Sequence, residues 1–100
     1  MIIFSKQQFE DKRIGVVITI KELNVHFKLV ELLRILFDTT RNTDQIPETC
    51  IKVFNEFPNT KYITMGGLMT LADNSPKRQL AQRVQYWAQE LSWWLRWSLM

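Results

Sequence analysis

Residues 75–100 read SPKRQLAQRVQYWAQELSWWLRWSLM, and this segment predicts the longest helix of the chain. Ser75 can accept a hydrogen bond from a free backbone amide, and Pro76 fits the first helical position because no donor is lost there. Large apolar side chains then recur at steps of three and four residues, which is the helical period. They are Leu80, Val84, Trp87, Leu91, Trp94 and Leu95. We expect this stripe to face the core.

A second aromatic row lies on another face of the same predicted helix, at Tyr86, Trp93 and Trp97. A helix that meets only water on its outer side rarely carries two tryptophans there. We predict that a protein partner or a second copy of the chain covers this face, with Tyr86, Trp93, Arg96 and Trp97 in the interface. Two alternatives stay open. The amino-terminal strands could cover the row within one chain, or it could enter a membrane interface, which a single basic anchor disfavours.

Upstream of this helix, the sequence predicts a small antiparallel sheet. Residues 14–20, IGVVITI, are β-branched apart from the glycine and follow a polar break, so we expect a strand there. Its expected partner is residues 2–9, and residues 61–64 predict a third, short strand. Such a sheet needs a helix on one face to be stable.

Three further helices are expected between these strands and the last helix. Leu29, Leu32, Leu33 and Leu36 have helical spacing, and the polar run of residues 39–43 ends that helix. A second helix is expected after a cap at Thr43 or Asp44, with Pro47 in its first turn, Ile51, Phe54 and Phe57 as its buried stripe, and residues 57–59 closing it. Gly66 and Gly67 predict a turn into a brief helix over residues 68–72. The fold class is therefore α+β: a small antiparallel sheet packed against several helices, with a long carboxy-terminal helix.

Length and composition limit the kinds of protein that the chain can be. It has 100 residues, 46% hydrophobic and 23% charged, which predicts one domain over residues 1–100 and excludes a two-domain enzyme. Cys50 is the only cysteine, so no disulfide forms within the chain and a reducing compartment is favoured. The amino terminus lacks signal-peptide features, and no apolar run reaches the roughly 20 residues that cross a bilayer. We expect a protein of the host-cell cytoplasm with no membrane association.

The residue types that carry out catalysis or bind metals are scarce. His26 is the only histidine and lies between Val25 and Phe27, where a structural role with satisfied hydrogen bonds is expected. A lone Cys50 predicts inert packing. The familiar zinc sites need more histidines or cysteines than one chain offers, and Gly66-Gly67 lacks the spacing of a phosphate-binding loop. We therefore expect no enzyme activity, no metal and no cofactor, and favour a binding protein.

The excess positive charge lies in the last forty residues. Residues 1–60 hold eight basic and eight acidic side chains, whereas residues 61–100 hold five basic and two acidic ones. Cations at the start of a helix can hold a phosphate, and glutamines on the same helix can reach base edges. The residues expected to contact DNA are Lys77, Arg78, Gln82, Arg83 and Gln85. The alternative is a solvated helix face, because these residue types are good helix formers.

Part of the sequence follows a recognisable pattern. Its positions are Ile63-Thr64, Gly67-Leu68, Leu71, Ser75, Ala81, Val84, Trp87 and Glu90. This segment, residues 63–90, resembles the amino-terminal domain of viral BRO proteins and of related phage antirepressors in the KilA-like group. In that family a strand leads into a helix that starts with Gly-Leu, and a serine follows. The next helix carries an alanine, an aromatic or apolar residue and a tryptophan, spaced three residues apart. The resemblance implies a small α+β domain of a virus, phage or mobile element that binds DNA or antagonises a repressor.

Two functions follow as hypotheses. The first is a regulatory protein of the antirepressor class that binds double-stranded DNA, a repressor protein or both, and thereby alters transcription. The second is a non-enzymatic antagonist that binds and inhibits a host protein through its aromatic carboxy-terminal helix, because buried Trp, Tyr and Arg dominate binding at such surfaces. Both hypotheses predict a protein partner or self-association.

Overall fold

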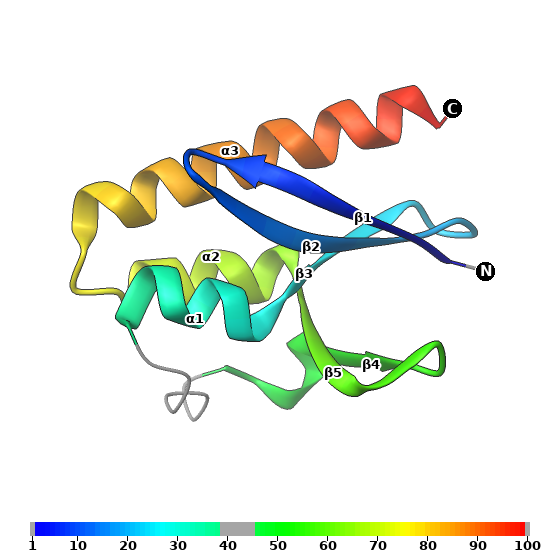
Figure 1. Cartoon of the computed structure of the whole chain (residues 1–100), viewed down its shortest axis with the longest axis horizontal. Coiled ribbons are helices and arrows are strands. Elements are labelled where there is room, and N and C mark those ends of the chain that lie inside the picture. The colour runs from blue at the N-terminus through cyan, green and yellow to red at the C-terminus, as the bar shows by residue number, and fades with distance from the viewer. Residues whose placement is uncertain (1, 39–45, 100) are drawn as a thin grey trace.

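The computed structural model describes residues 2–38 and 46–99, and these form an antiparallel sheet with three α-helices against it (Figure 1). The strands are β1 (Ile2–Phe9), β2 (Lys12–Thr19), β3 (Asn24–Lys28), β4 (Ile51–Phe54) and β5 (Phe57–Thr64). The helices are α1 (Leu29–Phe37), α2 (Met65–Asp73) and α3 (Arg78–Ser98), and a short 3₁₀ helix covers Glu48–Cys50. The predicted α+β class is confirmed.

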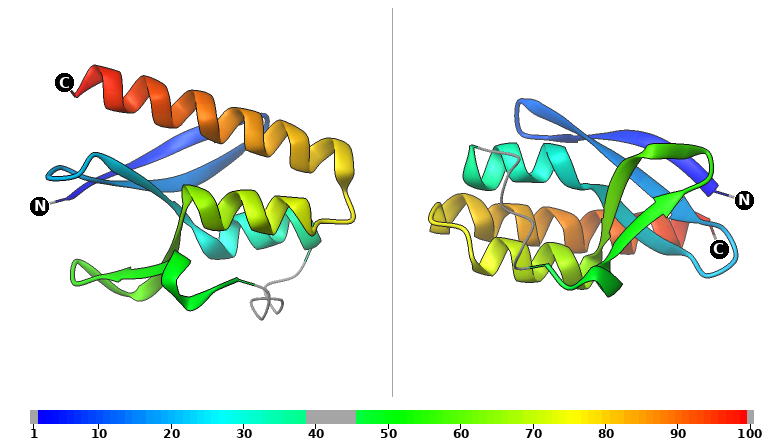
Figure 2. Two further views of the ribbon diagram at one scale, coloured as in Figure 1. Left: turned by 180° about the vertical axis from the view of Figure 1, so that it is seen from behind. Right: turned by 90° about the horizontal axis from the view of Figure 1, so that it is seen from below.

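All neighbouring strands of the sheet run antiparallel, in the order β1-β2-β3-β5-β4. The β1–β2 hairpin pairs Ile2 with Thr19 and Phe9 with Lys12, which confirms the predicted pairing of the first two strands. α2 and α3 form an antiparallel pair joined by a short loop, and the carboxyl end of α3 reaches the side of the molecule where β2 turns into β3 (Figures 1 and 2). The turn between β2 and β3 therefore lies near the last turns of α3.

One face of the sheet packs against the helices to form the main core. Alternate residues of β2 and β3 point to this face, as the period of a strand requires. They pack against the apolar side chains of α1, α2 and α3. The core residues that the sheet supplies include Ile14, Val16, Ile18, Val25, Phe27 and Ile63. These side chains are almost completely excluded from solvent.

The opposite face of the sheet is partly covered, because the sheet curls on itself. Phe57 of β5 meets Phe4 of β1 with ring centroids 5.3 Å apart, although β2 and β3 lie between β1 and β5 in the sheet order. Beneath this contact Val17 and Tyr62 are buried. The curl creates a concave face lined by aromatic rings, and His26 of β3 points into it with Val17, its cross-strand partner.

The core face of α3 is centred on small residues. Ala81, Val84, Ala88 and Leu95 are buried, whereas Leu80, Trp87 and Leu91 are only partly buried against the core. The expectation that Trp94 faces the core is wrong, since its side chain is 59% exposed. The prediction followed large side chains and passed over Ala81 and Ala88, whose small size lets neighbouring elements approach the helix. Trp94 therefore lies at the rim of the buried face.

The expected second helix is wrong where the structure describes it. Ile51 and Phe54 belong to β4, and Phe57 opens β5 instead of closing a helix. The three-residue steps that suggested a helix also fit a short hairpin, whose turn lies at Asn55 and Glu56. Pro58 is tolerated because the register of β4 and β5 shifts there. The expected caps Thr43 and Asp44, and the polar run of residues 39–43, lie outside the described residues.

Smaller differences concern the starts of helices and a strand that was not predicted. Gly66 and Gly67 lie inside the first turn of α2, not in a turn before it, because Thr64 caps that helix by accepting from the Gly67 amide at 3.1 Å. α3 begins at Arg78, two residues later than predicted. Ser75 still accepts from the Lys77 amide at 3.1 Å, and its hydroxyl donates to the Leu36 carbonyl at 2.7 Å. The central strand β3 was not predicted.

The two glycines of α2 should respond differently to alanine. A Cβ at Gly67 would lie 2.9 Å from the Cβ of Cys50 and 3.3 Å from that of Ile63. We expect Gly67→Ala to lower the free energy of unfolding by about 1–3 kcal/mol, the usual cost of overpacking. Gly66→Ala, the matched control, meets no atom closer than 3.9 Å and should stabilise α2 by about 0.5–1 kcal/mol.

Urea unfolding followed by circular dichroism measures both changes. Equal stability of the two variants would contradict the close packing of Gly67 against Cys50.

Candidate functional site

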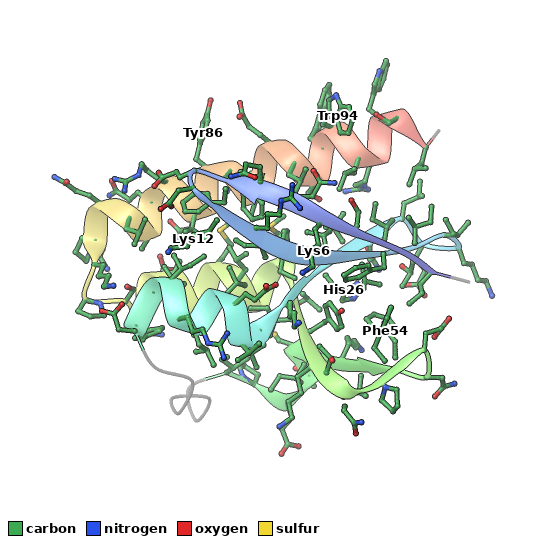
Figure 3. All side chains as sticks on the ribbon, in the orientation of Figure 1. Lys6, Lys12, His26, Phe54, Tyr86 and Trp94 are labelled. Atoms are coloured by element: carbon green, nitrogen blue, oxygen red, sulfur yellow. The ribbon has the colours of Figure 1, made fainter. Side chains whose placement is uncertain are left out.

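The exposed side of α3 carries four aromatic side chains, which we call the aromatic face: Tyr86, Trp93, Trp94 and Trp97. Each of these residues is between 59% and 69% exposed. Trp93 and Trp97 stack on one another, with ring centroids 5.8 Å apart and planes inclined by only 3°. Tyr86 and Trp94 project from α3 away from the sheet (Figure 3). The alternative in which the amino-terminal strands cover this row is therefore wrong.

The aromatic face is about as large as the largest apolar patch of an ordinary monomer. A fully buried aromatic side chain hides 150–250 Å², so four of them at these exposures leave roughly 400–650 Å² of ring surface in water. The largest apolar patch of an ordinary monomer is about 300–600 Å², and each partner in a standard interface buries about 800 Å². The aromatic face alone supplies half or more of the area that one partner buries in such an interface.

Charge around the aromatic face is sparse. Glu90 lies one helical turn after Tyr86. Hydrogen bonding to the Glu90 carboxylate, together with its negative charge, raises the pKa of the Tyr86 hydroxyl above its usual value. Beside it, a hollow in the surface is lined by Trp87, Gln89, Glu90, Leu91, Trp93 and Trp94.

Two of the cations expected to contact DNA are engaged in ion pairs. Lys77 Nζ lies 2.6 Å from Asp38 Oδ1 at the end of α1, and Arg83 Nε lies 2.6 Å from Glu10 Oε2 in the β1–β2 turn. All four side chains are at least one-third exposed. Such surface pairs contribute about 0–1 kcal/mol, so they fix the side chains without adding much stability.

The other residues that were expected to contact DNA do not form one continuous surface with these two. Arg78 donates to the Asp73 carbonyl at 2.8 Å, and Gln85 donates both to the Met69 carbonyl and to the Asp73 carboxylate, at 3.1 and 2.9 Å. Gln85 therefore faces α2, whereas Arg83 faces the β1–β2 turn. Gln82 is exposed between these two directions. The five residues are spread around α3 instead of lying on one side.

Arg96 was predicted in the interface with Trp93 and Trp97, but it lines a separate cavity. That cavity lies between the concave face of the sheet, the start of α2 and the end of α3, and His26 contributes to its wall. The adjacent residues Arg96 and Trp97 therefore face different surroundings, because successive helical side chains differ by about 100°. Sequence spacing alone did not separate them.

His26 is buried but not fully satisfied, which differs from the expected structural role. Only 4% of the residue is exposed, and its ring meets Phe54 edge to face with centroids 5.2 Å apart. Its Nδ1 has no hydrogen-bond partner among the described residues. Burial lowers the pKa of the imidazole below its usual value, the charge of Lys52 lowers it further, and hydrogen bonding to the Val17 and Asn24 backbone raises it by less. The ring is therefore neutral near pH 7.

Other kinds of site were searched for in the part of the chain that the structure describes. There, no three residues among the histidines, cysteines, aspartates and glutamates lie close enough together to hold a metal ion. None of the described helices combines the length and the apolarity that a membrane span requires. Cys50 is partly buried and packs against the core.

No family model, curated protein or solved structure matches the chain.

The buried imidazole predicts a loss of stability in acid. Because burial lowers the pKa of His26 in the folded state, the unfolded chain takes up the proton first, near its usual value of about 6.5. Above about pH 6.5, neutral His26 makes its full contribution to the free energy of unfolding. As the pH decreases below that value, this contribution decreases by at most about 1.4 kcal/mol per pH unit. We expect the free energy of unfolding to fall less between pH 7.5 and pH 5 in His26→Phe than in the natural chain.

Urea unfolding at both pH values, in a buffer without phosphate, tests this prediction. Carboxylates titrate alike in the two proteins, so identical pH dependence would show that the His26 pKa is not lowered.

Proposed function

We propose that the chain is a small, non-enzymatic regulatory protein of the antirepressor type, encoded by a virus or phage, which acts by binding a repressor protein. In this proposal the aromatic face of α3 is the contact surface. The observation that carries it is the stacked, exposed pair Trp93 and Trp97. Interface energy concentrates in tryptophan, tyrosine and arginine side chains that become fully desolvated, and three tryptophans with a tyrosine match that composition.

The positions that resemble the BRO and KilA-like pattern support this division of roles. Gly67, Leu68 and Ser75 are buried in or beside α2, and Ala81 and Val84 are buried in α3. These pattern residues thus build the fold, in the order of strand, helix, serine and helix that the family has. The aromatic face lies outside them, where partner choice can differ between proteins that share a fold.

Removal of the two stacked rings tests the proposal. We expect Trp93→Ser/Trp97→Ser to weaken binding of the repressor by at least about 2 kcal/mol, roughly thirtyfold, because hot-spot tryptophans are lost. The matched control is Gln79→Ser/Gln82→Ser, which changes two exposed residues of the same helix. Affinity capture from the native host cells identifies the partner, and release of that partner from its operator DNA measures the activity.

Three outcomes would contradict the proposal. The captured protein could fail to bind DNA. The tryptophan variant and the glutamine control could also capture the partner equally. Light scattering could instead show a dimer of the natural chain that the tryptophan variant dissociates, which would make a second copy the occupant of the aromatic face.

Binding to double-stranded DNA is a second candidate function, favoured by the charge of the last forty residues. These carry five basic and two acidic side chains. The ion pairs of Lys77 and Arg83 are exposed and weak, so a phosphate can replace either carboxylate. Arg78 at the first position of α3 adds a third cation, beside Lys77.

This second function makes a measurable prediction about salt. The affinity for a duplex should fall by about one log unit per log unit of salt for each phosphate contacted, and Lys77→Ala/Arg78→Ala should reduce that slope by about two. Fluorescence anisotropy with a labelled duplex at several salt concentrations measures the slope. The control Lys61→Ala, on β5, should leave the salt slope unchanged. An unchanged slope in Lys77→Ala/Arg78→Ala would show that the start of α3 does not contact DNA.

A further inference from the structure

The two edge strands of the sheet differ in how well they are protected from pairing with another strand. β4 has only four residues, and its register with β5 shifts between Val53 and Phe54. Short edge strands and such irregularities are common means of protecting an exposed edge. β1 has eight residues, contains no proline and pairs with β2 in one continuous register from Ile2 to Phe9. β1 is therefore the edge that can accept a further strand.

The backbone of β1 offers hydrogen bonds on the side away from β2. Alternate residues of an antiparallel strand direct their N–H and C=O groups to opposite sides. The Gln8 carbonyl accepts from Trp87 Nε1 at 2.8 Å, so Gln8 points away from β2. Lys6 and Phe4, two and four residues earlier, point the same way, and on that side no described residue bonds to their backbone. Their amides and carbonyls can therefore pair with an added strand.

α3 covers only the carboxyl end of this edge. Trp87 holds the middle of α3 against the backbone of Gln8. From there α3 and β1 separate toward the amino end of β1, where the two ribbons diverge (Figures 1 and 2). Ile3 and Phe4 lie in that open part and are 38% and 42% exposed. The accessible part of the edge is thus residues 2–6.

A second copy of the chain is complementary to this edge. When two β1 strands pair antiparallel about a two-fold axis at Phe4, Ile2 of each copy lies opposite Lys6 of the other. The one charged residue of the paired segment thus faces an isoleucine, and no like charges oppose one another. A register centred two residues later would oppose Lys6 to itself and would need the Gln8 carbonyl, which Trp87 already occupies. Two-fold dimers are also the commonest closed assemblies of identical chains.

The same pairing accounts for an aromatic ring that a single chain leaves in water. Phe4 is the most exposed aromatic residue of the described strands, although one side of its ring packs against Phe57. At the two-fold axis Phe4 of one copy lies opposite Phe4 of the other, and aromatic residues in such cross-strand positions stabilise the pairing. The exposed Ile3 lies on the other face of the sheet, opposite Ser5 of the second copy.

We propose that the chain forms a homodimer in which two β1 strands pair antiparallel around Phe4 and join two five-stranded sheets into one. Only residues 2–6 of each strand pair, so the contact is smaller than a standard interface and the dimer is weak. The contact does not use Trp93 or Trp97, and the aromatic face of each copy stays open. The proposal does not depend on the proposed function.

Sedimentation equilibrium of the full chain tests the proposal over concentrations from about 10 µM to about 1 mM, where a weak dimer dissociates and forms. We expect the mean mass to rise from that of one chain toward that of two. A single chain at every concentration would overturn the proposal. A mass that grows beyond two chains would also overturn it, because a two-fold contact closes with the second copy.

Amide hydrogen exchange of the natural chain locates the contact. The amides of Phe4 and Lys6 point away from β2, so their exchange should slow severalfold as the concentration rises and the dimer forms. The amides of Ser5 and Gln7 point to β2 and are already paired in one chain, so they serve as the internal control. Unchanged exchange of Phe4 and Lys6 in a dimer would place the contact elsewhere and overturn the proposal.

Two substitutions at one position separate strand pairing from charge. Lys6→Pro removes the outward amide, and an edge strand tolerates proline where its amide faces solvent, so we expect dimerisation to weaken by at least about tenfold. Lys6→Thr, the matched control, removes the same charge but keeps the amide, and should dimerise as the natural chain does. Equal dimerisation of the two variants would overturn the proposal. Circular dichroism verifies that each variant is folded, and the exchange measurement requires no variant.

A last variant separates this contact from the aromatic face. Trp93→Ser/Trp97→Ser leaves β1 unchanged and should dimerise as the natural chain does. Dissociation of the dimer by this variant would place the second copy on the aromatic face and overturn the proposal.

Discussion

The contact of Trp87 with the sheet fixes the rotation of α3, and the exposure of the aromatic face depends on it. Its ring packs against Phe9 and Phe27, with centroids 5.5 and 5.8 Å away, and its Nε1 donates to the Gln8 carbonyl at 2.8 Å. On the inner side, Ala88 is fully buried. With about 100° between successive residues, this rotation turns positions 86, 93 and 97 directly away from the core. The same packing that builds the core therefore exposes the aromatic face.

The curl of the sheet has a comparable effect on the opposite side of the molecule. A flat sheet would leave the face that carries His26 in water. The meeting of Phe4 and Phe57 instead closes that face, and Tyr62 becomes fully buried beneath it. Since Thr64 is both the cross-strand partner of His26 and the cap of α2, the buried imidazole comes to lie beside a helix start. Burial of His26 and formation of the cavity thus have one structural cause.

Local patterns in the sequence predicted the elements whose stability is local. The β-branched run of β2 and the periodic leucines of α1 were sufficient, and so was the long repeat of α3. The failures involve partners far away in the chain. Ile51, Phe54 and Phe57 fit both a helix and a hairpin, and pairing with β3 selects the hairpin. The exposure of Tyr86, Trp93 and Trp97 was predicted because these rings fall off the core stripe, whereas Trp94 was wrongly assigned to that stripe. The cavity was not predicted, because its groups come from separate elements.

The adjacent residues Arg96 and Trp97 face different surroundings for a geometric reason. Leu95 is the last buried residue of the helix, and the two residues after it diverge by about 100°. Arg96 therefore turns to the cavity beside α2, and Trp97 turns to solvent to stack on Trp93. The aromatic face and the cavity therefore share α3 without sharing side chains.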